Sequence, residues 1–363
     1  MIAYNSTAAG NDAAGTANGG HVTGNPRPWA SLPAYRAQLA GGGEQRLVRH
    51  LVTALGDYFP RSLLINYYVS LKTNPFVVLT GREGAGRAAL AAGFAAALVG
   101  HESGQAITIG SDRWARRSSQ SSYYRGIHER FGVSQYLETL HEAAAPENSG
   151  KVYLVLLKGL TADELDLYLN RLVRPGRHGE RRLALPGIPA AEQPLLPPNC
   201  FVTATMHAPR GAPPLELDVF QHAGQIAFGP DLRRAPALSA LPLPPVGLQR
   251  VMLRAICRDP RQARARLAAI LGPARMRRLG PSAEVVRLLV EGGANIPRDL
   301  NGTVLPYVAN SFDEEGRGLF DPFDAWHNAR QAYDAQMVQR LLWRVNWQQR
   351  GLRHRLADML RRY

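Results

Sequence analysis

A glycine-rich turn that follows a short apolar run carries the residues best suited to bind a phosphate group. Residues 76–80 read FVVLT, and residues 81–88 read GREGAGRA. This spacing fits the pattern G-x-x-x-x-G-K-[ST], in which backbone N–H groups curl around phosphate at the start of a helix. The candidate phosphate-binding residues are Gly81, Gly84, Ala85, Gly86, Arg87 and Ala88.

Two side chains of that pattern are replaced, and an acidic residue in the turn opposes phosphate binding. Arg87 stands where the pattern has Lys, and its planar fork is larger than a compact ammonium group. Ala88 stands where the pattern has Ser or Thr, and it has no oxygen to offer Mg²⁺. Glu83 adds a carboxylate inside the turn, which repels phosphate unless it is paired. The alternative is an ordinary strand-to-helix turn that binds nothing.

A second acidic position, which nucleotide hydrolysis requires after another buried strand, is missing. The apolar run at residues 152–157 is followed by Lys158 and a glycine, not by the acids that would position Mg²⁺ and polarise water. Asp163 and Glu164 come one turn later, at positions typical of helix capping or of the surface.

Alternating buried strands and helices must position these residues. We expect five strands, at residues 76–80, 106–109, 152–157, 201–205 and 225–228. Helical spacing predicts two helices over residues 47–71, broken at Pro60, and others at 88–99, 136–145, 161–172, 246–256, 261–271, 283–290 and 332–360. Residues 175–198 are rich in Pro and Gly and predict a loop. Continuous apolar strands separated by helices favour an α/β fold with a parallel sheet that is covered on both faces.

Composition divides the chain into three parts. Residues 1–33 have no periodicity, are rich in Ala, Gly, Asn, Ser and Thr, and predict a disordered tail. Residues 34–240 hold all the expected strands, and residues 241–363 are expected to be helical, with a proline-rich connector at the border.

The order of the segments resembles that of the McrB-like branch of AAA+ ATPases. The matching segments are NPFVVLTG at 74–81, QYLETLHEA at 135–143, VYLVLLKGLT at 152–161, LPPNCFVTATMH at 196–207, VFQHAGQIAF at 219–228 and DAQMVQRLL at 334–342. The most specific of them is the PPNxFVTxT match within residues 197–205. The resemblance implies a P-loop NTPase AAA+ core with a five-stranded parallel sheet, followed by a C-terminal helical lid.

The resemblance also identifies four catalytic positions of the family, and all of them are changed here. The P-loop Lys and Ser/Thr are Arg87 and Ala88, and the acidic pair falls at Leu157 and Lys158 or at Lys158 and Gly159. The sensor Asn is His207, and the Asp-Arg pair is Gln221 and His222. It therefore implies a degenerate member that binds ATP or GTP weakly at most, has lost the Mg²⁺ site and assembles with copies of itself or with active AAA+ subunits. Relatives act in restriction and defence against foreign DNA.

A large excess of arginine makes nucleic acid a candidate partner. The chain has 363 residues and a formal net charge of +14. Cations alternate with aromatic residues at Arg113, Trp114, Arg116, Arg117 and Arg125, as in proteins that bind single strands. Nine further arginines lie between residues 250 and 278. Ordinary solvated surface is the alternative for both stretches.

The remaining features favour a cytoplasmic protein without a bound metal. Cys200 and Cys257 fit no metal or disulfide spacing, no signal peptide is visible, and no apolar run reaches the roughly 20 residues that a membrane span needs. Three functions stay open: a pseudo-ATPase that serves as a structural or regulatory subunit, an NTPase with displaced catalytic residues such as Lys158 and His207, and a nucleic-acid-binding module that needs no nucleotide.

Overall fold

The computed structural model describes residues 43–110, 135–161, 195–207, 223–228, 235–280 and 300–340, with short stretches at 165, 173–175, 181–183, 189, 287, 290–291 and 354–355. The expected tail at residues 1–33, the residues at 113–125 and the pair at 221–222 lie outside these ranges. Within the described ranges, no helix combines the length and the apolar character that crossing a membrane requires.

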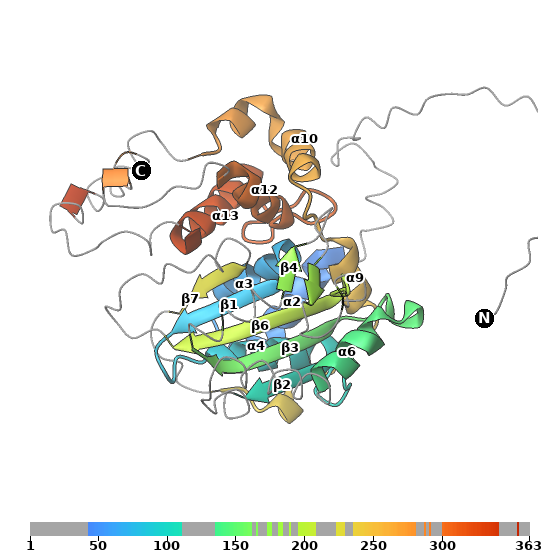
Figure 1. Ribbon diagram of the computed structural model, residues 1–363. Helices are drawn as coiled ribbons and strands as arrows, with labels where there is room; N and C mark the ends of the chain where they lie inside the picture. The colour runs from blue at the N-terminus through green and yellow to red at the C-terminus, as the bar shows by residue number, and fades with distance from the viewer. Residues whose placement is uncertain are drawn as a thin grey trace, which may run out of the picture.

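Five parallel strands form the central sheet, as the apolar runs predicted. They are β1 (Phe76–Gly81), β2 (Ala106–Gly110), β3 (Tyr153–Leu160), β6 (Cys200–His207) and β7 (Gly224–Ala227). Their order across the sheet is β2-β3-β6-β1-β7, so β1 lies in the interior between β6 and β7. Figure 1 shows the arrowheads of β1, β3 and β6 at one edge of the sheet, where the turn after β1 also lies.

Both faces of the sheet are covered, which explains why its strands are continuously apolar. Successive side chains of a strand point to opposite faces, yet neighbouring residues such as Val77 and Val78, or Leu156 and Leu157, are all buried. Helices α3 (Arg61–Thr73) and α4 (Arg87–Val99) pack against one face, and α6 (Gln135–Ala144) packs against β3. The Tyr153 hydroxyl on β3 donates a hydrogen bond to Glu142 Oε1 of α6 at 2.9 Å.

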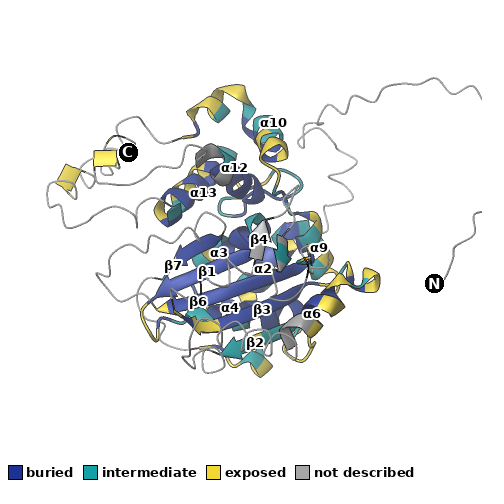
Figure 2. Cartoon of the chain, viewed as in Figure 1, coloured by how far each residue is buried: buried dark blue, intermediate teal, exposed yellow. Residues whose placement is uncertain are grey.

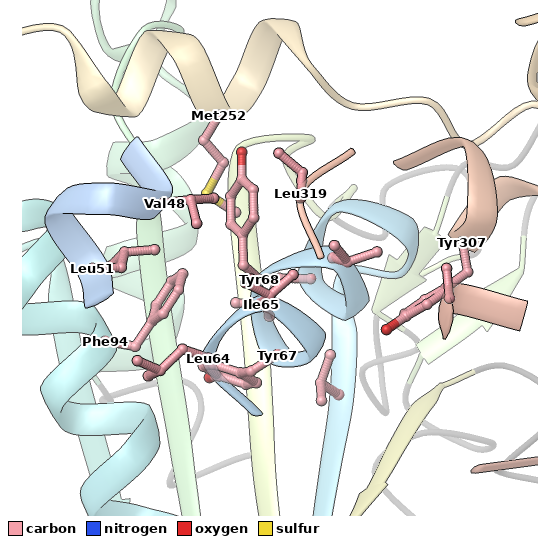
Figure 3. Packing of buried hydrophobic residues seen from close by; sticks show 14 of the residues in the cluster. Val48, Leu51, Leu64, Ile65, Tyr67, Tyr68, Phe94, Met252, Tyr307 and Leu319 are labelled. Atoms are coloured by element: carbon pink, nitrogen blue, oxygen red, sulfur yellow. The ribbon is translucent and has the colours of Figure 1, made fainter. Parts of the chain in front are cut away.

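The core on the α3 and α4 side is built around aromatic residues. The Phe94 ring meets Tyr67 edge-on with a centroid separation of 5.0 Å (Figure 3). Gly93 on α4 leaves room for Leu55, because a Cβ there would lie 3.0 Å from Leu55 Cδ2. Leu55 ends α2 (Gly43–Leu55), so α2 and α4 approach closely.

The helices near the C-terminus share this core. They are α9 (Leu248–Arg254), α10 (Pro260–Arg278), α12 (Leu300–Asn310) and α13 (Ala325–Arg340). The Tyr307 hydroxyl of α12 and the Gln339 amide of α13 both donate to Asn66 Oδ1 of α3, at 2.6 and 2.7 Å. Figure 2 shows α12 and α13 lying over the sheet end near α3, with buried residues along their facing sides.

Three local features differ from the expectations. The loop expected at 175–198 contains part of a short antiparallel hairpin, β4 (Val173–Pro175) with β5 (Arg181–Leu183). Helix α12 was not expected. Helix α13 begins at Ala325, seven residues before the predicted start at 332, because Asp324 Oδ1 accepts from the amides of Trp326 and His327 at 2.8 and 3.0 Å.

Candidate functional site

Three glycines shape the turn between β1 and α4. Gly81, Gly84 and Gly86 have φ of 154°, 77° and 84°, a region that L-residues rarely adopt. A Cβ at Gly81 would also lie 2.9 Å from Phe228 Cβ, beside β7. Nothing lies within 4 Å of a Cβ at Gly84, so glycine is needed there for conformation alone.

The start of α4 offers backbone donors to an anion. Gly86 occupies the N-cap position, and no side chain caps the helix. The amide of Leu90 is the donor to Gly86 O at 2.8 Å, which leaves the first-turn amides before it for water or a ligand. Ala85 is buried, whereas Arg82, Glu83 and Gly84 are exposed. The turn can therefore present amides to phosphate, with Glu83 as the opposing charge.

The Arg87 side chain reaches the sheet. Its Nη1 donates to the backbone carbonyl of Met206, near the end of β6. Partial burial lowers the pKa of Arg87, and the Glu83 carboxylate opposes that shift. The guanidinium thus ties the first turn of α4 to β6 instead of extending freely over the turn. No local pattern could have revealed this contact, because the two residues are 119 positions apart.

The carboxyl end of β3 holds a cation and a glycine. Leu157 is fully buried, while Lys158 and Gly159 are exposed. The β3–β6 register shifts between Leu157 and Leu160. At this irregularity Gly159 has φ of 75°, and its amide donates to Thr205 Oγ1 at 2.8 Å. The backbone here is fixed by Thr205, a contact that sequence reasoning missed.

The structure brings most of the predicted positions to one edge. His207 is exposed at the end of β6, directly opposite Gly81 in the β1–β6 register. Lys158 lies on β3, the strand on the other side of β6. Arg82 is exposed on the turn and Lys158 is exposed at the end of β3, so both add positive charge at this edge of the sheet. In the described ranges, no three His, Cys, Asp or Glu side chains gather closely enough to hold a metal ion.

The two cysteines are free and buried. Burial raises the pKa of the Cys200 thiol to about 12, so it stays protonated and unreactive near neutral pH.

Comparison with solved structures gives distant structural likenesses. No family model and no curated protein matches the chain. Among solved structures, a full-length MCM homolog from Methanopyrus kandleri superposes with a TM-score of 0.41 and 12% sequence identity, covering 86% of this chain and 62% of that one. The chain thus spans less than two thirds of that protein's length.

Proposed function

We propose that this chain is a degenerate McrB-like AAA+ protein, a pseudo-ATPase that keeps the P-loop for its fold and does not hydrolyse nucleotide. The observation that carries the proposal is the bond from Arg87 to the Met206 carbonyl. The side chain that should neutralise the outer phosphates joins helix α4 to strand β6. Phosphoryl transfer depends almost entirely on positioning and charge neutralisation, so this change removes a central requirement.

The surroundings of the turn support the same conclusion. The turn follows an interior strand at the carboxyl edge of a parallel sheet, where open α/β sheets bind ligands. At that edge Ala88 has no Mg²⁺ ligand, Lys158 stands where an acid is needed, and His207 replaces the sensor Asn. Replacement of catalytic residues at positions that act together is consistent with a fold that is retained without nucleotide hydrolysis.

In this proposal the chain works as a structural or regulatory subunit. The lid expected over residues 241–363 would include helices α9, α10, α12 and α13, and the partners are further copies of this chain or active AAA+ subunits. The assembly is nucleic-acid-related, with the defence role of McrB-like relatives as the first candidate. A working NTPase with displaced catalysts would have to give new roles to His207, Asp163, Glu164 and Lys158.

Calorimetric titration with ATP and with GTP tests the proposed site. Only backbone amides and nearby cations contact phosphate in this account, so weak binding should occur with the same Kd in Mg²⁺ and in EDTA. Gly86→Val should abolish the heat, because valine disfavours the left-handed N-cap conformation. Binding that tightens strongly with Mg²⁺ would show that oxygen ligands survive elsewhere and would contradict the proposal.

A further inference from the structure

The arginine-rich stretch at residues 250–278 divides into two groups in the structure. Two of its nine arginines are structural. Arg266 is buried and donates to the carbonyls of Phe312 and Asp313 at 2.8 and 2.7 Å. Arg258 donates to Lys72 O at 3.2 Å and lies over the Phe201 ring. The other seven are exposed, namely Arg250, Arg254, Arg261, Arg264, Arg275, Arg277 and Arg278.

We propose that these seven residues, the arginine surface of α9 and α10, bind the phosphodiester backbone of nucleic acid. The proposal goes beyond the pseudo-ATPase assignment and requires no nucleotide. It also concerns elements other than the predicted stretch at 113–125, which lies outside the described residues.

The charge of the arginine surface is not neutralised within the described part of the chain. None of the seven side chains has a carboxylate within ion-pair distance there, whereas Arg317 lies 3.0 Å from Asp313 and 2.8 Å from Glu315. Asp259 is the only acid between residues 248 and 278. Its side chain caps α10 by accepting from the Arg261 amide at 2.9 Å. Like charges gathered without counter-charges repel one another, and a polyanion relieves that repulsion.

The exposed positions of α10 favour nucleic acid over a protein partner. Its apolar side chains, among them Ala263, Leu267 and Leu271, are turned into the core. Between the arginines the exposed residues are polar or small, such as Gln262 and Ala274, and Figure 2 colours much of the helix as exposed. Protein interfaces need a buried apolar or aromatic centre, whereas phosphate contacts need only correctly placed cations.

Two of the seven arginines line a groove beside α9. Arg250 and Arg254 are four residues apart on one side of this helix, and with Lys151 they line a cavity of about 680 Å³. Gly150 leaves room for the Arg250 side chain, since a Cβ there would lie 3.0 Å from Nε. Glu147 is the one acid in the lining. The exposed Val246, which precedes α9, also lines this groove, whereas the exposed Leu243 does not.

Fluorescence anisotropy with labelled DNA, in a salt series and without nucleotide, tests the proposal. The full chain should bind duplex DNA with affinity that falls steeply as salt rises. The variant Arg250→Gln/Arg254→Gln/Arg264→Gln should reduce the slope of log K against log salt by about 3, or about 1 for each lost phosphate contact. Because all three side chains are exposed, its unfolding midpoint should match that of the unmodified chain.

The control variant Arg287→Gln/Arg330→Gln/Arg355→Gln removes the same net charge from other elements. Its Arg287 and Arg355 already pair with Glu291, at 3.7 and 2.9 Å. The control should keep the original slope. Equal losses in the two variants, salt-independent binding, or stronger binding of polyglutamate than of DNA would each overturn the proposal. A failed nucleotide titration would leave it intact, since no nucleotide is present in this assay.

Discussion

Replacing Lys72 by methionine should lower the free energy of unfolding by about 3–5 kcal/mol, because it leaves a buried carboxylate without its cation. Lys72 Nζ lies 2.6 Å from Glu44 Oε1, and both side chains are fully buried. Lys72 also donates to the carbonyl of Asn310 at 2.9 Å, and the Tyr68 hydroxyl donates to Glu44 Oε1 at 2.7 Å. The pair therefore joins α2 and α3 to the end of α12.

Desolvation explains why removing one charge of the pair should cost more stability than removing both charges. Burial raises the pKa of Glu44 and lowers the pKa of Lys72, against the attraction between them. Both charges are thus held at a desolvation cost, and Glu44 Oε2 has no hydrogen-bond partner within the described structure. An uncharged pair of similar shape avoids that cost.

Urea unfolding of three variants measures this coupling. The double variant Glu44→Gln/Lys72→Met should recover most of the stability that Lys72→Met loses, because glutamine keeps an acceptor for Tyr68 without a charge. A double variant as unstable as Lys72→Met alone would show that the buried charge is not the cause of the loss.

Asn199→Ala should cost about 2–3 kcal/mol, since it leaves buried carbonyls without a donor. The Asn199 side chain is 3% exposed. Its Nδ2 donates to the carbonyls of Ala143, Asn148 and Lys151 at 3.0, 3.1 and 3.0 Å. These bonds attach the turn after α6 to the start of β6. The most specific segment of the McrB-like resemblance therefore has a structural role at this residue.

Asn199→Asp is the matched test, because aspartate has nearly the same shape but replaces the NH₂ donor with an acceptor. Thermal and urea unfolding should show it to be at least as unstable as Asn199→Ala at neutral pH. Stability close to that of the unmodified chain would mean that shape alone, and not donation to three carbonyls, fixes this turn.

Most of the sheet was predictable from sequence, because strands covered on both faces need continuous apolar runs. Helix α12 was not, since Pro306 and Gly302 interrupt its pattern. The β4–β5 hairpin has three residues per strand and is rich in Arg, so it carries no apolar signal. The start of α13 could have been found, because Asp324 is a typical N-cap residue.

The candidate site was predictable as a set of positions but not as a set of contacts. Strand ends in a parallel sheet meet at one edge, which brings Gly81, Lys158 and His207 together. The bond from Arg87 to Met206 and that from Gly159 to Thr205 depend on tertiary geometry. The same holds for Glu44 and Lys72, two charged residues that local sequence would place on the surface.

Release of inorganic phosphate by the purified full chain, with Mg²⁺ and either ATP or GTP, tests the pseudo-ATPase assignment most directly. Phosphate release should proceed at the rate of the protein-free blank, both for the unmodified chain and for Gly86→Val. Turnover above the blank that Gly86→Val abolishes would contradict the pseudo-ATPase assignment. If Lys158→Ala also abolished this turnover, catalysis would be assigned to displaced residues.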